Sequence, residues 1–356
     1  MNQTNKVEAF AAEILDRGAS GFAAAAALRL LDDRPEIEER YSPSAMDAWK
    51  SHLTQRVNEL SAAVAVGSSA MFVNRVIWSR RIFDARDFKR EDLEASLAAL
   101  HAVLEDKLPA NAQDSALRFI SDARTAMATQ LEEDDSLLDA GQAHGRLALQ
   151  YLHCAIEGNV LPAMEVVLDQ LGAGTLSAED AMLSVLLPAQ AEIGRLWHLG
   201  ELSVAEEHLV TTTTNRLMAV IANRADRRRD NGKTAVACSV AGNVHDVGIQ
   251  AIAYLLELEG WRSIYLGANV PAGDLPATLK FFEADVVLLS CALSVHLKNL
   301  RKTIAIIRDE SKKVPKILVG GLAFFEAPEL WKEIGADGYA LDAKGALESA
   351  RDLVDL

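Results

Sequence analysis

The sequence predicts an α + α/β multidomain protein, with a helical N-terminal domain, a four-helix bundle cap and a C-terminal doubly wound, five-stranded parallel sheet. Three observations predict this fold class. Nearly every segment before residue 232 has the apolar spacing of a helix, whereas short apolar runs alternate with amphipathic stretches after it. The polar run Arg224–Lys233 marks the change and predicts a linker. The later apolar runs are continuous, which is typical of parallel strands covered on both faces.

Residues 1–140 predict a helical domain of unknown role. Helices are expected near 5–16, 20–32, 44–66, 69–86, 91–106 and 112–131. Ser42 and Ser44 are candidate caps of the third helix, and Pro43 suits its start. No group of reactive residues in this domain indicates a reaction.

Residues 141–226 predict an antiparallel four-helix bundle, because helical stretches at 143–157, 160–171, 178–198 and 203–223 are joined by short turns. Residues 233–356 predict a Rossmann-like domain with strands at 234–240, 263–267, 286–291, 316–320 and 338–341. Helices are expected between them, near 246–259, 272–282, 297–309, 327–334 and 343–355. In such sheets ligands bind beyond the carboxyl ends of the strands.

Composition narrows the possible partners. The formal net charge of −15 disfavours sequence-independent binding to nucleic acid or anionic lipid. The four arginines of the linker could form a nucleic-acid patch, but in an acidic chain we expect a solvated connector. Cys154, Cys238 and Cys291 lie far apart, which suits a reducing compartment. With no signal peptide in view and no apolar stretch long enough for a membrane span, we expect a cytoplasmic protein.

The loop after the first predicted strand carries a histidine where this kind of fold builds its site. It runs from Ala241 to Gly248 and contains His245. A neutral imidazole nitrogen suits a transition metal such as cobalt. Asn243 could accept the N–H of the other ring nitrogen. The alternative is a histidine that caps the following helix, and from the loop alone both interpretations stand.

The string Asn243-x-His245-x-x-Gly248 resembles the DxHxxG signature of the cobalamin-binding domains of methionine synthase, methylmalonyl-CoA mutase and their relatives. Ser290 follows Gly248 after 41 residues, and a Gly-Gly pair follows Ala292 after 27. The resemblance implies that the dimethylbenzimidazole tail of cobalamin leaves the cobalt and enters the domain, while His245 binds the metal. The resemblance also implies that nine residues contact the cofactor: Asn243, Val244, Asp246, Val247, Gly248, Ser290, Ala292, Gly320 and Gly321.

One position departs from the family pattern, because Asn243 stands where Asp is usual. An amide orients an imidazole without making it more basic, so we expect a weaker cobalt bond or one less responsive to protonation. Asp246 could supply charge instead, although we expect it to cap the following helix.

A second resemblance lies in the bundle, where Trp197 is followed by nine residues and then by Glu207–His208. This spacing resembles the helical cap of B12-dependent photoreceptors, the carotenoid-gene repressors that sense light with adenosylcobalamin. The resemblance implies that Trp197 shields the adenosyl group and that Glu207 and His208 line its pocket. It implies that His198 can bind cobalt after photolysis.

These resemblances together predict a cobalamin-based light sensor, and not an enzyme, with adenosylcobalamin as its cofactor. The helical N-terminal domain is expected to bind a protein partner, form a homo-oligomer or house a second ligand. Some relatives, the photocobilins, also hold a bilin such as biliverdin, and the layout is compatible with that. Direct DNA binding is disfavoured, because the first 140 residues are acidic and show no recognition helix.

Two alternatives remain. A corrinoid protein that carries methyl groups for a partner methyltransferase would share the bundle and the α/β domain, but it needs an open upper face, which Trp197 and His198 argue against. A flavodoxin-like module for a flavin or phosphate would need a phosphate cradle rich in glycine and hydroxyl groups, which the His245 loop lacks.

Overall fold

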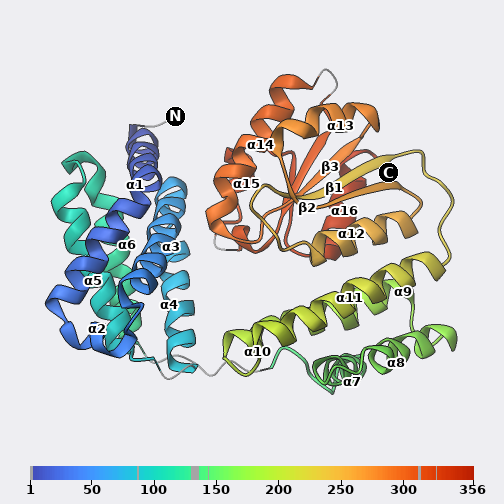
Figure 1. The fold of residues 1–356 in the computed structure, drawn as a ribbon. Helices are drawn as coiled ribbons and strands as arrows, with labels where there is room; N and C mark the ends of the chain where they lie inside the picture. The colour runs from blue at the N-terminus through green and yellow to red at the C-terminus, as the bar shows by residue number, and fades with distance from the viewer. Residues whose placement is uncertain (1–2, 86–87, 130–135, 143, 312–313, 326) are drawn as a thin grey trace. The chain divides into compact units, whose positions relative to one another are not determined.

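The computed structural model describes residues 3–85, 88–129, 136–142, 144–311, 314–325 and 327–356. It divides into two compact units, Met1–Glu133 and Asp134–Leu356. The first is helical, and the second combines further helices with a five-stranded parallel sheet (Figure 1). The fold class predicted from the sequence is confirmed.

The first unit is built from six helices: α1 (Gln3–Asp33), α2 (Pro35–Tyr41), α3 (Ala45–Val66), α4 (Ser69–Ala85), α5 (Arg90–Lys107) and α6 (Ala110–Met127). The expected break near residue 18 is wrong, because α1 continues through Gly18 and Gly21. Each glycine costs a helix about 1 kcal/mol. Burial of flanking residues such as Leu15 and Ala23 offsets that cost.

The prediction that a serine side chain caps α3 is also wrong. Ser44 occupies the N-cap position, but its side chain makes no capping hydrogen bond. Its backbone angles, φ −106° and ψ 14°, are not the extended conformation from which a serine oxygen reaches the first free N–H groups. The short helix α2, which was not predicted, ends just before this turn.

The second unit begins with the bundle, formed by α7 (Gly145–Ile156), α8 (Val160–Gly172), α9 (Ala178–Asp180), the π-helix η1 (Ala181–Leu186), α10 (Leu187–His198) and α11 (Val204–Arg224). The predicted helix 178–198 therefore contains a π-helical stretch. Ser203 starts α11 through a capping box with Glu206, which fixes the turn between α10 and α11. A buried hydrogen bond of 2.7 Å between the hydroxyls of Tyr151 and Thr214 links α7 to α11.

The sheet has the strand order β2-β1-β3-β4-β5, and all neighbouring pairs are parallel. Its strands are β1 (Thr234–Val240), β2 (Arg262–Val270), β3 (Val286–Ser290), β4 (Lys316–Gly320) and β5 (Gly338–Ala340). The helices α12 (Val247–Leu258) and α16 (Ala343–Leu353) contact each other on one face (Figure 1). The other connections are η2 (Ala272–Asp274), α13 (Leu275–Phe281), η3 (Ser294–His296), α14 (Leu297–Glu310), η4 (Leu322–Phe324) and α15 (Leu330–Glu333). Burial on both faces, expected for every strand, is complete for β1 but not for the edge strand β2, which is partly exposed.

The bundle packs on the α/β part through α11, which contacts α12 (Figure 1). The backbone N–H of Arg228, four residues after the end of α11, donates to the carbonyl of Leu258 at the end of α12 at 2.8 Å. Helix α11 has 21 residues and α12 has 12, and α11 extends beyond the start of α12 (Figure 1). The start of α12 lies at the carboxyl edge of the sheet, so the first part of α11 projects past that edge.

The linker arginines are paired locally. Arg227 lies 2.8 Å from Glu257, and Arg228 lies 4.0 Å from Glu259. These contacts fit the predicted connector and leave less positive charge for a nucleic-acid patch. Among the residues described, no helix has both the length and the apolar character needed to cross a membrane.

Candidate functional site

The His245 loop lies at the carboxyl edge of the sheet, between β1 and α12. Its tight turn uses Gly242, whose φ of 85° is a left-handed conformation that suits glycine. A Cβ at this position would lie 3.1 Å from the ring of His296. Asn243 is fully buried, whereas His245 is exposed. The loop therefore anchors itself through Asn243 and presents the imidazole outward.

The orientation of the Asn243 amide follows from its surroundings. Its Nδ2 donates to two backbone carbonyls, that of His245 at 3.3 Å and that of Ser290 at 3.2 Å. Its Oδ1 accordingly faces the backbone N–H and the ring Nδ1 of His245, both at 3.3 Å. Because an amide oxygen can only accept, this contact favours the imidazole tautomer with the proton on Nδ1. The lone pair then lies on Nε2, which has no hydrogen-bond partner among the described residues.

Exchanging the Asn243 amide for the carboxylate usual in the family should destabilise this protein in the absence of ligand. In Asn243→Asp, an oxygen would face the carbonyl oxygens of His245 and Ser290 in a fully buried position. We expect a loss of about 2 kcal/mol in unfolding free energy, measured by urea denaturation.

Asn269→Asp is the matched control for that substitution. Asn269 uses its Oδ1 to accept from the N–H of Gly242 at 2.7 Å, and a carboxylate keeps that bond. Equal stability losses in the two variants would contradict the deduced orientation of Asn243.

Asp246 does not cap α12, contrary to our expectation. It stands at the N-cap position, but its carboxylate instead accepts a hydrogen bond of 2.6 Å from the hydroxyl of Tyr265 on β2. Burial and this bond raise the pKa of Tyr265 above its ordinary value, so the phenol remains a donor. Asp246 thereby ties the loop to the edge strand. The next residue, Val247, begins α12 and packs against the core.

The small residues Ser290, Ala292, Gly320 and Gly321, predicted to bind the cofactor, lie at the exits of β3 and β4. Ser290 ends β3 and pairs in register with Gly320, which ends β4. A Cβ on Gly321 would lie 2.4 Å from the backbone oxygen of Cys291, and one on Gly320 would lie 2.9 Å from that of Ala340. Ala292 is half-buried beside them. Close packing of the strand exits is therefore one reason for these glycines. Gly248 is different, because a Cβ there would meet nothing within 4 Å.

Three residues of this edge were not predicted as site residues. Tyr265 and Asn269 hold the loop through the bonds just given. His296 lies on η3 beside Gly242, and its Nδ1 is buried without a hydrogen-bond partner among the described residues. Burial, and then the neighbouring His245, lower the pKa of His296, so its ring is neutral near pH 7. Spacing along the chain gives no signal for these contacts, because they form between different strand exits.

The helical cap brings the other predicted residues together at one end of the bundle. Trp197 and His198 end α10, and Glu207 and His208 lie in the first turns of α11. His198 is buried, at 6% exposure, whereas His208 is exposed and pairs through Nδ1 with Glu207 at 2.5 Å. All four lie at the turn between α10 and α11, beside the part of α11 that extends past the sheet edge.

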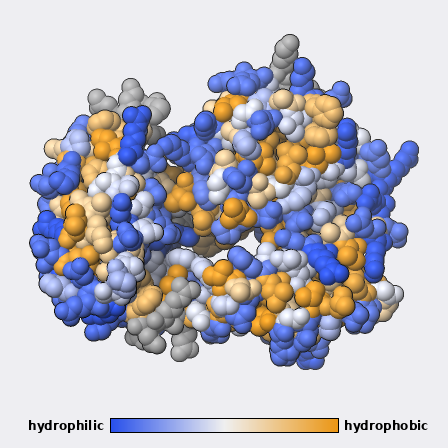
Figure 2. Space-filling model, viewed as in Figure 1, coloured by the Kyte–Doolittle hydropathy of each residue, from blue (hydrophilic) through white to orange (hydrophobic). Residues whose placement is uncertain are grey.

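Apolar side chains are exposed around the same edge. Val244, Leu322 and Leu341, which follow β1, β4 and β5, are 68%, 72% and 66% exposed. Figure 2 shows apolar patches on the surface of both the bundle and the α/β part. Large exposed apolar groups at neighbouring loops are typical of a surface that a ligand or partner covers.

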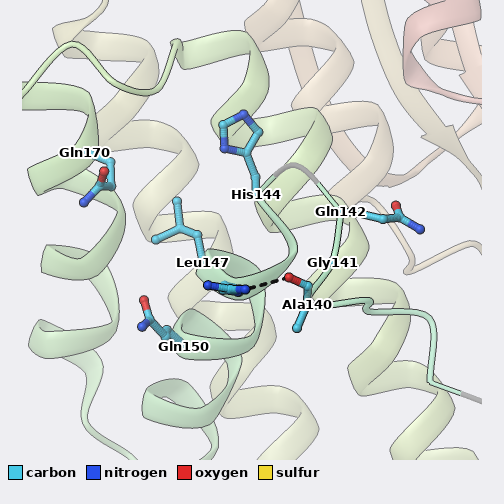
Figure 3. A pocket seen from close by; sticks show the side chains of 8 residues that line it. Ala140, Gly141, Gln142, His144, Leu147, Gln150 and Gln170 are labelled. Carbon is cyan, nitrogen blue, oxygen red and sulfur yellow. Dashed lines mark hydrogen bonds between the residues drawn. The ribbon is translucent and has the colours of Figure 1, made fainter.

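His245 does not line either of two pockets in the second unit. One of about 340 Å³ is lined by the exits of β1 and β2 and by α14: Ala241, Pro271, Ala272, Gly273, Asn299, Lys302 and Ile306. Another of about 430 Å³ lies at the start of the bundle, where His144, Gln150 and Gln170 surround it (Figure 3). None of the predicted site residues lines either pocket.

Comparisons with known proteins match the same two regions. A model of the B12 binding domain matches residues 232–350, and a second B12 binding domain model matches residues 147–222. Dimethylamine corrinoid protein 3 of Methanosarcina mazei is 30% identical over 118 residues, which are 33% of this chain and 69% of that protein. The HTH-type transcriptional repressor CarH of Myxococcus xanthus is 29% identical over 162 residues, which are 46% of this chain and 53% of the repressor.

A solved structure, the monomethylamine corrinoid protein of Methanosarcina barkeri, superposes with a TM-score of 0.53 at 18% identity, covering 59% of this chain and all of that one. That likeness supports the fold. The chain spans about half the length of several of the curated relatives that it matches. On the two domain matches and the identity to the corrinoid proteins, the chain belongs to the family of B12-binding proteins.

Proposed function

We propose that this protein is a cobalamin-dependent light sensor, in which His245 binds the cobalt from below and Trp197 and His198 cover the upper face. One observation carries the proposal. A histidine with an unengaged Nε2 lies at the sheet edge, and a tryptophan and a buried histidine lie on the helices that extend past that edge. The similarity to the repressor CarH, 29% identical over 162 residues, supports it.

The residues at this edge fit cobalamin. An imidazole whose Nδ1 is held by Asn243 has its other ring nitrogen available as a donor that suits cobalt. The open space at Gly248 and the exposed Val244, Leu322 and Leu341 suit a broad, partly apolar macrocycle. Bound adenosylcobalamin would supply a cobalt–carbon bond that light can break. Trp197 would exclude water from that bond, and His198 would offer the cobalt a second nitrogen ligand.

The conformational change that follows light absorption would begin at α10. Glu192, on the same helix as Trp197, accepts hydrogen bonds from the Ser136 hydroxyl at 2.9 Å and the Leu137 N–H at 2.8 Å. Arg195 pairs with the same carboxylate at 2.8 Å. A shift of α10 would thus move residues 136–137, which adjoin the boundary between the two units. This is a packing switch driven from one ligand position.

Removal of the Glu192 carboxylate should loosen this connection. In Glu192→Ala, the hydrogen bonds that Arg195, Leu137 and Ser136 donate to the largely buried carboxylate are lost, and we expect a loss of about 3 kcal/mol in unfolding free energy. Burial opposes ionisation of Glu192, but the hydrogen bonds from Arg195, Leu137 and Ser136 outweigh it and lower the pKa of the carboxyl below its ordinary 4.5.

A carboxyl with a lowered pKa stabilises the fold above its ordinary pKa and loses that effect as the pH falls through the lowered value. The stability difference between wild type and Glu192→Ala should therefore shrink below pH 4.5. Urea unfolding of both proteins across that range measures it. A difference independent of pH would show that the charge of Glu192 contributes nothing.

The proposal is tested by illumination. The purified protein loaded with adenosylcobalamin in the dark should change its absorption spectrum on exposure to visible light. His198→Ala should give a different light product, because the protein's upper ligand is missing. A wild-type spectrum that does not respond to light would reject the proposal.

A second candidate function is a carrier of methyl groups for a partner methyltransferase. The similarity to dimethylamine corrinoid proteins favours it. Methyl transfer from the cobalamin-loaded protein to added acceptors and a methyltransferase in the dark would decide for this function and against the sensor.

We further propose that the helical N-terminal unit joins two copies of the chain or binds a protein partner, and that the chain does not bind DNA directly. The proposal accommodates a bilin such as biliverdin as a second chromophore. Red-light absorption that persists after removal of cobalamin would demonstrate the bilin. Sedimentation in the dark and after light tests the oligomer.

A further inference from the structure

Helix α1 is apolar on two opposite faces. One face packs within the first unit, where α1 contacts α3 and α5 and where Leu15, Ala23 and Leu30 are buried. On the opposite face, Val7 and Phe10 are large apolar side chains that are 46% and 44% exposed. Because a helix that is apolar all round is normally covered all round, this outer face indicates a partner that its own unit does not supply.

The exposed face of α1 follows a seven-residue repeat. Spacings of three and four residues alternate along it, which is the pattern with which two helices pack side by side. We call the six residues of this repeat the outer stripe, and each of them is exposed or partly exposed. They form two rows, Val7, Ile14 and Gly21 in one row and Phe10, Arg17 and Ala24 in the other. The outer stripe is about 26 Å long, at 1.5 Å per residue.

The charge of the outer stripe favours a second copy of the chain as its partner. The formal net charge is −15, so two copies repel each other over much of their surface. The outer stripe carries no carboxylate, and Glu13 on the same helix balances its single charged residue, Arg17, at 2.6 Å. Two copies can therefore meet along the outer stripe without a surplus of like charge.

The side-chain sizes along the outer stripe match in one antiparallel register. When the two rows face each other in opposite directions, residues whose numbers add up to 31 lie opposite one another. Phe10 then lies opposite Gly21 of the other copy. A Cβ at Gly21 would meet nothing within 4 Å in its own chain, so the glycine leaves room for the ring. The largest side chain of the outer stripe thus faces its smallest.

The same register brings opposite charges together. The stem of Arg17 lies opposite Ile14 of the other copy, and Glu13 of that copy is its neighbour on the same side of the stripe. The two arginines and two glutamates then alternate in sign around the two-fold axis. Parallel pairing would instead place Arg17 against Arg17 and Gly21 against Gly21, which combines like charges with a gap in the packing.

We infer that α1 is the self-association surface of this protein, on which a second copy packs antiparallel along the outer stripe with Phe10 over Gly21. This inference deepens the proposal that the first unit joins two copies, and it selects a copy of the same chain over a different protein. Both copies use the same surface, so the contact closes at a dimer.

Sedimentation velocity of the whole chain without cobalamin measures the dissociation constant of the dimer. Phe10→Asp should raise it about 100-fold, because each copy loses a buried ring and gains a charge. Gly21→Leu should raise it about tenfold, since the new side chain occupies the space of the opposite Phe10. Leucine favours a helix more than glycine does, so the melting temperature of the Gly21→Leu monomer should not fall.

An exchange of charges tests the register. Glu13→Arg and Arg17→Glu should each raise the dissociation constant about tenfold, because each variant places four like charges around the axis. The double variant should dimerise as wild type does, because the signs alternate again. Leu161→Asp is the matched control, since it replaces a leucine of α8 that is 60% exposed, and it should sediment as wild type does.

Spin labels measured by electron paramagnetic resonance test the direction of pairing. The labels would be attached through Ser20→Cys or Arg29→Cys in a Cys154→Ser background, since Cys238 and Cys291 are buried. The antiparallel register predicts that the two labels of a dimer are offset along the helix by about 14 Å at residue 20 and about 40 Å at residue 29. Parallel pairing predicts no offset at either position.

The inference is overturned by a wild-type protein that stays monomeric up to its solubility limit. A dimer that Phe10→Asp and Gly21→Leu leave unchanged would overturn it too, as would equal label distances at residues 20 and 29. A dimer with the expected register whose cobalamin spectrum does not respond to light would instead reject the sensor function and leave this inference intact.

Discussion

Replacing His245 with alanine should lower the affinity of the protein for cobalamin by about 100-fold or more. Loss of a residue that merely supports a metal ligand costs about 10- to 100-fold, and His245 is proposed as the ligand itself. Asn243 already contacts the ring through Nδ1 at 3.3 Å, which leaves Nε2 for the metal. Equilibrium titration followed by visible absorption measures the affinity and reports the axial ligand.

The control and a rescue make this prediction specific. His153→Ala changes an exposed histidine of α7 that pairs with Glu157, and it should bind cobalamin as wild type does. Free imidazole added to His245→Ala should restore part of the wild-type spectrum, because the cavity left by the side chain is at the surface. Equal affinity and an identical spectrum for His245→Ala and wild type would contradict the assignment.

Substitution of Gly321 by alanine should unfold or severely destabilise the α/β part. Its φ of 107° disfavours any other residue, and the new Cβ would lie 2.4 Å from the backbone oxygen of Cys291. A left-handed conformation costs a residue with a side chain about 1–2 kcal/mol, and the clash with backbone adds to it. We expect a total loss of about 3 kcal/mol or more, measured by thermal and urea unfolding.

Gly267→Ala isolates the contribution of the clash. Gly267 has a φ of 85°, but a Cβ there would meet nothing within 4 Å. This variant should lose about 1–2 kcal/mol, the conformational cost alone. If both variants lose the same free energy, the close approach of Gly321 to the β3 exit does not stabilise the sheet.

Local sequence patterns predicted most of the α/β part. The bounds of β1 and β4 agree with the structure, because each is a largely apolar run followed within two residues by a glycine in a turn. Patterns failed where packing overrides local preference. Helix α1 continues through two glycines, and the predicted third bundle helix contains the π-helix η1. Neither outcome has a signature in residue spacing, since both depend on neighbours from other helices.

For the candidate site too, residue spacing predicted positions along the chain but not contacts between distant segments. Spacing placed His245 in the loop after β1 and the Trp197–His198 pair at the end of a helix. It could not give the contacts between strand exits, such as Asn243 with Ser290 or Asp246 with Tyr265. The roles of the individual site residues remain predictions. The extension of α11 past α12 could not be predicted either, because it follows from how the linker docks on the end of α12.

Coordination of cobalt by His245 is the contact on which the account depends, and electron paramagnetic resonance tests it directly. The protein would be produced with ¹⁵N-labelled histidine, loaded with unlabelled cobalamin and reduced to the Co(II) state in the dark. A histidine ligand predicts that the nitrogen splitting of the cobalt signal is a doublet, from spin-½ ¹⁵N. A triplet would show that an unlabelled nitrogen of the vitamin still binds the metal, and would contradict the account.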